Sequence, residues 1–386
     1  MGKRLTGLFL AAVLIFCALP LTIRAAEPEV SAPSAVLMEA STGTILYEKE
    51  SHQRLAPASV TKVMTLLLVM EALDSGRISW EDTVTASETA AAKGGSQVYL
   101  EAGEQMTMDE MLKSVVVSSA NDCATALAEH IAGSEQAFVS MMNSRAAELG
   151  MEDTHFVNCT GLDDSVEAGD HLTSAHDIAL MSRELLKHDD IRKYTTIWMD
   201  TVRNGEFGLS NTNKLVRFYD GTTGLKTGYT STAGHCLSAS AKRDGIEFIA
   251  VVLNCQSSGD RFQSARQLLD HGFANYALAD PVGQTELSAV PVVLGTVKQI
   301  VPVPADPSPI LIDKAKKNGI TTQVELAEEV RAPVEAGQRL GTLTVCDQGV
   351  PMASIPLVAE EAVERLSWWQ VTKILLQSLM FAGEIK

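Results

Sequence analysis

The chain has 386 residues, of which 46% are hydrophobic and 20% are charged, and its formal net charge at pH 7 is −17. This length allows one large domain or two medium ones, since domains commonly hold roughly 100–200 residues. The acidic excess argues against a nucleic-acid-binding protein, because phosphate contacts need clustered lysine and arginine. An acidic chain can still bind an anionic substrate, but only through locally placed cations.

The N-terminus has the features of an export signal. Lys3 and Arg4 form a short positive region, and the apolar stretch 8–19 follows it and ends at Pro20. Small residues at 25 and 26 suit a processing site, and the stretch is too short for a comfortable membrane span. We therefore predict that residues 1–26 are a signal peptide and that the mature protein is exported.

Removal of this segment, which contains one cysteine, leaves Cys123, Cys159, Cys236, Cys255 and Cys346. An odd number means that at least one thiol is free or pairs between chains. The spacings match no zinc pattern, and no His-Glu-x-x-His arrangement is present. We expect small core residues rather than disulfides, and neither a metal nor a cofactor.

Local patterns predict the first elements of a mixed α/β domain. Apolar runs at 35–38 and 44–47 flank the turn residues 41–43 and predict a β-hairpin. An apolar helix over 63–70 follows directly. From about 108 to 186 the pattern is mostly helical.

Strand character returns late in this region. The segments 225–229, 235–241 and 247–254 are predicted strands, and the last two flank the hairpin turn Arg243-Asp244-Gly245. A predicted helix over 265–276 closes the region. Strands at both ends with helices between them indicate one domain whose sheet combines distant segments.

The composition changes near Pro281. Valine-rich runs then alternate with proline and glycine turns, which predicts a small all-β sandwich over 283–364. The segment 365–386 predicts an amphipathic helix. Its apolar face holds Trp368, Trp369, Leu375, Leu376, Leu379 and Met380. Such a helix suits a membrane interface, which we favour, or packing on its own domain or a partner.

Ser59-Val60-Thr61-Lys62 is the most informative motif. Residues three apart on a helix are neighbours, so a hydroxyl and an amine share one face. A serine hydroxyl needs a base to become a good nucleophile, and a lysine can act as that base if burial or nearby cations lower its pKa. Alone the motif is weak, because a helix start with a solvated lysine gives the same pattern.

Two further motifs give the first one its meaning. Ser119-Ala120-Asn121 lies in the helical region, and Lys226-Thr227-Gly228 begins a late strand. Ser-x-x-Lys, Ser-x-Asn and Lys-Thr-Gly in this order are the signature of penicillin-interacting serine enzymes. The chain resembles the D-alanyl-D-alanine carboxypeptidase family of low-molecular-mass penicillin-binding proteins. The stretches 149–163 and 171–177 resemble the same family.

This resemblance implies the fold and the location. The expected α/β fold is a penicillin-binding/β-lactamase-like domain over 30–278, in which an antiparallel sheet joins a helical subdomain. The β domain over 283–364 and the amphipathic helix over 365–386 fit the same layout. The implied location is the outer face of a bacterial cell membrane, to which the helix attaches the protein peripherally.

The resemblance also implies roles for the motif residues. Ser59 would attack the carbonyl between the last two D-alanines of a peptidoglycan stem peptide and form an acyl-enzyme. Lys62 would be its base, kept partly neutral by the positive field of Lys226 and by desolvation. Ser119 would relay a proton to the leaving amine, and Asn121 would hold the substrate amide.

The late strand would bind the rest of the substrate. Lys226 and Thr227 would bind the terminal carboxylate, and Gly228 would let the substrate backbone approach. The backbone N–H groups of Tyr229 and of the nucleophilic serine would form the oxyanion hole. Arg261 is either a second carboxylate contact or part of a surface ion pair.

The implied function is a serine-type D-Ala-D-Ala carboxypeptidase that β-lactam antibiotics inhibit by acylation. A β-lactamase-like hydrolase is an alternative, although Ala120 replaces the aspartate of the class A motif and no clear Glu-x-x-Leu-Asn follows. A non-catalytic wall-binding relative is another, although all three motifs are intact. A transpeptidase differs only in the acceptor of the acyl group.

Overall fold

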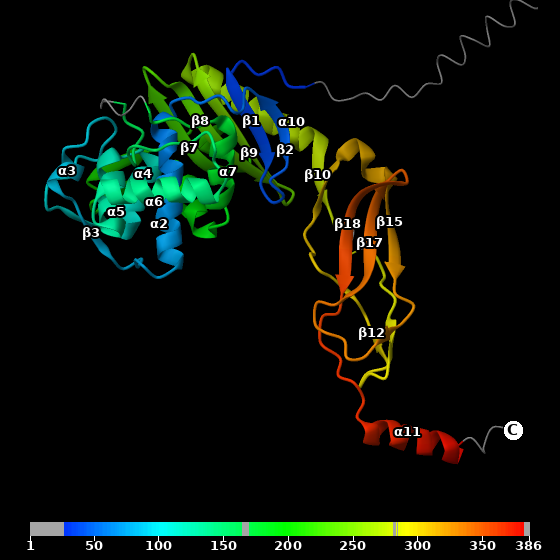
Figure 1. Ribbon diagram of the computed structural model, residues 1–386. Coiled ribbons are helices and arrows are strands. Elements are labelled where there is room, and N and C mark those ends of the chain that lie inside the picture. Colours follow the sequence, from blue (N-terminus) through cyan, green and yellow to red (C-terminus); the bar gives the residue numbers. More distant parts are fainter. Residues whose placement is uncertain (1–26, 164–169, 281–282, 284, 382–386) are drawn as a thin grey trace, which may run out of the picture.

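The computed structural model describes residues 27–163, 170–280, 283 and 285–381 (Figure 1). The predicted signal peptide, residues 1–26, lies outside the described residues. A domain of helices and strands comes first, a β domain extends away from it, and a helix lies at the far end of the β domain.

A five-stranded antiparallel sheet is the centre of the first domain, in the order β2-β1-β9-β8-β7. Its strands are β1 (Ser34–Glu39), β2 (Ile45–Lys49), β7 (Thr222–Thr230), β8 (Gly234–Arg243) and β9 (Ile246–Cys255). Both predicted hairpins are confirmed, and β1 pairs with β9, so the sheet does combine distant segments. The strand predicted at 225–229 is longer, because β7 pairs with β8 from Thr222 to Thr230.

Each face of this sheet is covered by its own hydrophobic core. Along β1, Ala35 and Leu37 pack in one core, and Val36 and Met38 pack in the other. This alternation follows from the period of two along a strand. One helix, α10 (Ser258–Asn275), covers the first face.

Helix α10 begins earlier than the predicted helix over 265–276. The Ser257 side chain accepts a hydrogen bond from the Asp260 N–H and so caps the helix there. The first turns lack a clear apolar run, so sequence periodicity did not reveal them. The earlier start places Arg261 inside the helix.

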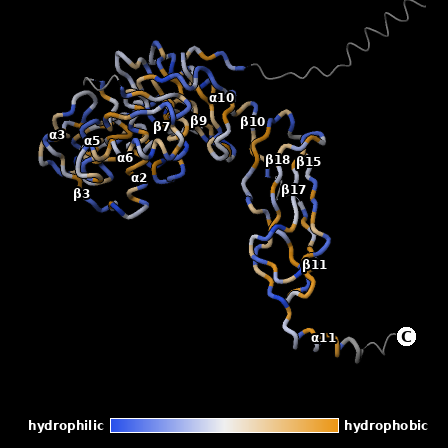
Figure 2. The backbone as a smooth tube through the Cα atoms, viewed as in Figure 1, coloured by the Kyte–Doolittle hydropathy of each residue, from blue (hydrophilic) through white to orange (hydrophobic). Residues whose placement is uncertain are grey.

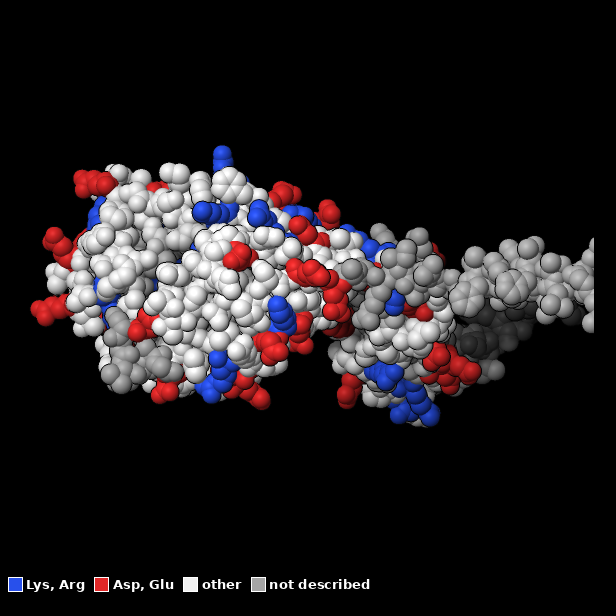
Figure 3. Space-filling model, turned by 90° about the horizontal axis from the view of Figure 1, so that it is seen from above, with Lys and Arg blue, Asp and Glu red and all other residues white. Residues whose placement is uncertain are grey.

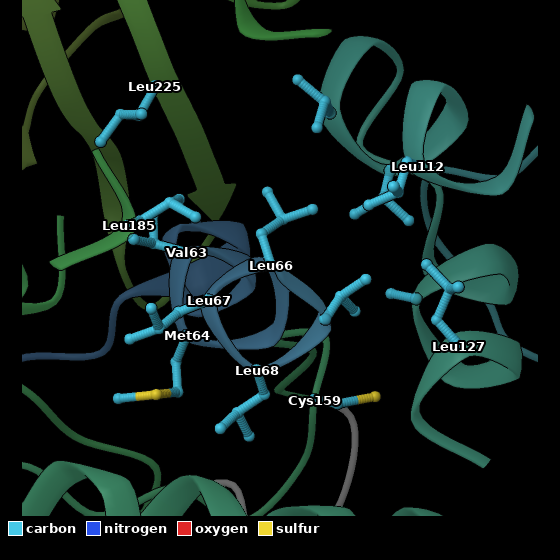
Figure 4. Close-up of a cluster of buried hydrophobic side chains, with 14 of the residues drawn as sticks. Val63, Met64, Leu66, Leu67, Leu68, Leu112, Leu127, Cys159, Leu185 and Leu225 are labelled. Atoms are coloured by element: carbon cyan, nitrogen blue, oxygen red, sulfur yellow. The ribbon is translucent and has the colours of Figure 1, made fainter. Parts of the chain in front are cut away.

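A helical subdomain covers the other face. Its main helices are α2 (Lys62–Asp74), α4 (Met108–Val117), α5 (Asn121–Ala132), α6 (Glu135–Glu148) and α7 (Ala175–Leu185). Side chains of α2 point outward all round the helix into the core, and Leu112, Leu127 and Leu185 come from the surrounding helices (Figure 4). A helix that is apolar on every side belongs in a protein interior.

Short elements complete this domain. They are η1 (Ala58–Thr61), β3 (Thr83–Thr85), α3 (Glu88–Ala91), β4 (Gln105–Thr107), η3 (Asp189–Ile191), α8 (Arg192–Thr195), β5 (Met199–Val202), β6 (Phe207–Ser210) and α9 (Leu215–Phe218).

The C-terminal β domain has one four-stranded and one three-stranded sheet, in the orders β13-β18-β17-β15 and β12-β11-β16, and β10 pairs with β14. The strands are β10 (Tyr276–Ala279), β11 (Val290–Val293), β12 (Gln299–Ile300), β13 (Val303–Pro304), β14 (Ile310–Asp313), β15 (Ile320–Leu326), β16 (Val330–Arg331), β17 (Arg339–Asp347) and β18 (Val350–Val358), with the 3₁₀ helix η4 (Lys314–Gly319). Two small apolar clusters form its core.

The last helix, α11 (Trp368–Phe381), leaves large apolar side chains in solvent. Trp368 is 83% exposed and Trp369 is 81% exposed, while Leu375 and Leu376 are more than half exposed. Figure 2 places α11 at the far end of the molecule, away from the domain cores. The side chains of Leu379 and Met380 lie outside the described part. Among the described helices, none is both long and apolar enough to span a bilayer.

Candidate active site

The nucleophile lies in the short turn that leads into α2. Ser59 is in η1 and is half-buried, and Lys62 is the first residue of α2 and has no exposed surface. The Lys62 Nζ lies 3.0 Å from the Ser59 Oγ. The spacing of three residues therefore brings the hydroxyl and the amine into hydrogen-bond contact, as the sequence predicted.

Two further oxygen atoms fix the lysine. Its Nζ donates to the Asn121 Oδ1 at 2.6 Å and to the Thr160 carbonyl at 2.8 Å. Burial lowers the pKa of Lys62 from 10.5 to about 7, because desolvation penalises the charged form. A neutral amine has two N–H groups and one lone pair. In the neutral form, hydrogen bonds from both N–H groups to Asn121 and Thr160 would leave the lone pair to accept the Ser59 proton.

The Ser-x-Asn motif joins α4 to α5. Asn121 begins α5, and its Nδ2 donates to the Gly94 carbonyl at 2.7 Å. Each end of its amide thus makes one hydrogen bond within the protein, and through Oδ1 Asn121 orients Lys62. One N–H and one lone pair stay available, and its contact with the substrate amide stays a prediction. Ser119 adopts a φ of +64° and is 4% exposed. Between the described residues no hydrogen bond joins Ser119 to Lys62, and its role as a relay stays a prediction.

The Lys-Thr-Gly motif lies in β7, on the edge of the sheet. Lys226 is buried, and its Nζ donates to the Thr227 carbonyl at 2.9 Å. Burial lowers its pKa well below 10.5, and the positive charges of Lys62 and Arg261 add to this. Within the described chain no carboxylate pairs with Lys226. An incoming carboxylate would supply the missing counter-charge.

Gly228 brings β7 against the nucleophile turn. A Cβ at this position would lie 2.6 Å from the Pro57 carbonyl oxygen and 3.1 Å from the Ser59 nitrogen. We expected this glycine to make room for the substrate. In the structure, the lack of a side chain at Gly228 instead lets β7 lie close to the protein's own backbone at Pro57 and Ser59. The neighbouring Tyr229 is 59% exposed and stacks on the His235 ring, with centroids 4.3 Å apart.

Arg261 reaches the same strand from α10. Its Nη1 donates to the Gly228 carbonyl at 2.9 Å and to the Cys236 carbonyl at 3.3 Å. The alternative of a surface ion pair is wrong, because Arg261 is 8% exposed and hydrogen-bonds backbone carbonyls instead. A contact with a substrate carboxylate stays a prediction.

One loop that holds the lysine lies in the family-like stretch 149–163, for which we predicted no contact with the active site. The Asn158 Oδ1 accepts from the N–H groups of Thr160 and Gly161, and this turn presents the Thr160 carbonyl to Lys62. A Cβ at Gly161 would lie 1.9 Å from the Ala58 carbonyl oxygen. Asn158-x-x-Gly161 is a turn signal, since asparagine commonly bonds its own backbone a few residues on. The sequence showed the turn but not its contact with α2.

The cysteines are confirmed as core residues. All five are free and buried. In the described part of the chain, no group of three or more His, Cys, Asp or Glu side chains is placed to hold a metal ion.

Two family models match the chain. The model described as D-alanyl-D-alanine carboxypeptidase matches residues 22–257, and the model described as penicillin-binding protein 5, C-terminal domain, matches residues 282–365. The chain belongs to the D-alanyl-D-alanine carboxypeptidase family.

Relatives of this family match along most of the chain. The D-alanyl-D-alanine carboxypeptidase DacF of Bacillus subtilis is 43% identical over 347 residues, which cover 89% of this chain and 88% of the relative. The D-alanyl-D-alanine carboxypeptidase DacD of Escherichia coli is 35% identical and covers 87% and 88%. These relatives support the carboxypeptidase prediction over a β-lactamase-like hydrolase.

Solved carboxypeptidase-family structures agree with the fold. Penicillin-binding protein 5 of Haemophilus influenzae aligns with a TM-score of 0.77 and 30% identity, over 89% of this chain and all of that one. The ampicillin-bound penicillin-binding protein D2 of Listeria monocytogenes aligns with a TM-score of 0.58 and 29% identity, over 64% and 100%. The predicted fold, a penicillin-binding domain followed by a β domain, is confirmed. The domain boundaries at 30–278 and 283–364 stay predictions.

Proposed function

We propose that this protein is a serine-type D-Ala-D-Ala carboxypeptidase that removes the terminal D-alanine from peptidoglycan stem peptides. The observation that supports this most strongly is the Lys62 amine, held 3.0 Å from the Ser59 hydroxyl by Asn121 and Thr160. A lysine with a pKa of about 7 is partly neutral at neutral pH and can accept the serine proton.

The reaction would run through an acyl-enzyme. Lys62 takes the Ser59 proton while the Oγ attacks the carbonyl between the two D-alanines. The N–H groups of Ser59 and Tyr229 stabilise the oxyanion. The peptide C–N bond then breaks, and the proton on Lys62 passes to the leaving amine, with Ser119 as the relay. Water hydrolyses the ester and restores the serine.

The substrate carboxylate would bind at β7. The Thr227 hydroxyl donates to the Thr212 hydroxyl at 2.7 Å. Lys226 is buried without a carboxylate partner among the described residues, and a substrate carboxylate would favour its protonated, positive form. This local charge overcomes the acidic excess of the whole chain. β-Lactam antibiotics carry a carboxylate and a strained amide, so they would acylate Ser59 in the same way.

We further propose that the protein works outside the cytoplasm, peripherally attached to the cell membrane. The supporting features are the signal-like segment 1–26 and the exposed tryptophans of α11. Tryptophan suits the interface because its ring is apolar and its N–H is polar.

The test is a comparison of the protein with its Ser59→Ala variant on a peptide that ends in D-Ala-D-Ala. We expect free D-alanine from the first and none from the second. Equal release would contradict the assignment of the nucleophile. Rapid penicillin hydrolysis without D-alanine release would favour the β-lactamase-like alternative.

A further inference from the structure

The residue before the nucleophile has an unusual backbone. Ala58 adopts a φ of +47°, in the left-handed region that residues with a Cβ rarely occupy. Such a conformation persists only when surrounding contacts hold it, and these conformations gather at functional sites. The contacts that hold Ala58 therefore bear on how Ser59 is presented.

A hydrogen-bonded chain ends at the Ala58 carbonyl. The Thr61 hydroxyl donates to this oxygen at 2.8 Å, and the same hydroxyl lies 2.7 Å from the His171 Nε2. The hydroxyl has only one hydrogen, which it gives to Ala58, so His171 is the donor to Thr61. The other ring nitrogen, Nδ1, accepts from the Val157 N–H at 3.0 Å. These contacts fix one tautomer of a neutral imidazole.

The histidine is held firmly in this state. His171 is 3% exposed, and its ring makes an edge contact with the Phe156 ring at a centroid distance of 5.7 Å. Burial lowers the pKa of His171 to about 4, and the charges of His155 and Lys62 act in the same direction. The ring therefore stays neutral and keeps its N–H directed at Thr61 at neutral pH.

The peptide group between Ala58 and Ser59 links the Thr61 contact to the reaction centre. The Ala58 carbonyl and the Ser59 N–H belong to one planar group and point in opposite directions. A fixed carbonyl therefore fixes the direction of the N–H. This N–H lies against Gly228, beside the strand that supplies the Tyr229 N–H.

We propose that His171 is a positioning residue that, through Thr61, aims the Ser59 N–H at the developing oxyanion. This inference rests on the proposed function. The oxyanion forms only in the transition state, so the effect belongs in kcat and not in substrate binding. Removing one oxyanion donor outright costs about 10²–10³-fold in rate, and misaligning it costs less.

The variants are Thr61→Val, His171→Leu and the double variant. We expect Thr61→Val to lower kcat for D-alanine release by about 10- to 100-fold, with KM within about twofold. His171→Leu should act in the same direction. The double variant should be no slower than the slower single variant, because both act through one carbonyl. His171→Gln keeps an N–H near the Nε2 position and should recover part of the rate.

Thr65→Val is the matched control. Thr65 lies one turn further along α2, is equally buried, and its hydroxyl also donates to a backbone carbonyl, that of Cys159, at 2.7 Å. It does not hydrogen-bond Ala58. Thr65→Val should therefore lower the melting temperature about as much as Thr61→Val and leave kcat within about twofold.

Three results would overturn the positioning role of His171 and Thr61. They are an unchanged kcat in Thr61→Val, a change confined to KM, or an equal loss of kcat in Thr65→Val. Thr61→Val is nearly isosteric, so it decides the matter even if His171→Leu fails to fold. Absence of D-alanine release from the wild-type protein would overturn the proposed function, and with it the positioning role of His171.

Discussion

At the scale of single residues, the site depends on Lys62, whose amine is only partly protonated at neutral pH. Lys62 is enclosed by core residues of α2 and by two oxygen acceptors, and its low pKa follows chiefly from burial. From the sequence, we expected Lys226 as well as desolvation to lower this pKa. The repulsion between the two lysines lowers the pKa of Lys226 instead. Burial is the largest cause of that lowering, and Lys62 and Arg261 add to it.

This charge state predicts a pH dependence. A base with a pKa of about 7 is protonated and inactive below that value, so kcat/KM should rise with pH through about 7. The rate should fall again at the pH where Lys226 loses the proton that binds the carboxylate, and the lowered pKa of Lys226 brings this fall below pH 10.5. Initial rates of D-alanine release, with folding checked by circular dichroism at each pH, measure this profile. A kcat/KM that is as high at about pH 5 as at about pH 7.5 would contradict Lys62 as the base.

At the scale of elements, the site is assembled where three segments meet at η1. Strand β7 approaches through Gly228, the turn 158–162 approaches through Gly161, and α2 continues from the turn itself. Each glycine gives its segment a contact that a side chain would block. The catalytic groups therefore depend on backbone packing as much as on their own chemistry.

Gly228→Ala tests this packing. The added Cβ would lie 2.6 Å from the Pro57 carbonyl oxygen, so β7 must move away from Ser59. We expect kcat/KM to fall by about 10²-fold or more, and the free energy of unfolding to fall by about 1–3 kcal/mol, as for other overpacked sites. Gly208→Ala, in β6 and open to space, is the control and should keep its activity. Full activity in Gly228→Ala would show that the close approach is not required.

The sequence predicted the elements better than their contacts. Turn residues and periodicity located the hairpins and the main helices because these signals are local. The bond from Lys62 to the Thr160 carbonyl and the packing of Arg261 on β7 depend on segments far apart in the chain. The three motifs predicted which residues meet at the active site. They did not predict the hydrogen bonds of Asn121 to Lys62 and Gly94, which depend on the fold.

At the scale of the whole molecule, the two domains place the active site and α11 far apart. The β domain extends from the catalytic domain and ends at α11 (Figure 1). On the face shown in Figure 3, acidic and basic side chains are interspersed. The exposed tryptophans of α11 thus offer the protein an attachment point away from the active site.

Removing α11 tests the attachment. A protein that ends at Arg365 should lose its association with phospholipid vesicles in a flotation assay and keep its carboxypeptidase activity on a soluble peptide. Trp368→Ala together with Trp369→Ala should weaken binding by about tenfold or more, because two large interfacial side chains are lost. Undiminished flotation of the truncated protein would show that α11 is not the anchor.

The proposed mechanism requires Ser59 to form the acyl-enzyme, and mass spectrometry after a short exposure to a penicillin tests this directly. We predict a mass increase of one penicillin per chain, carried by the peptide that contains Ser59 and absent from Ser59→Ala. An adduct that persists in Ser59→Ala, or that maps to another peptide, would contradict Ser59 as the nucleophile.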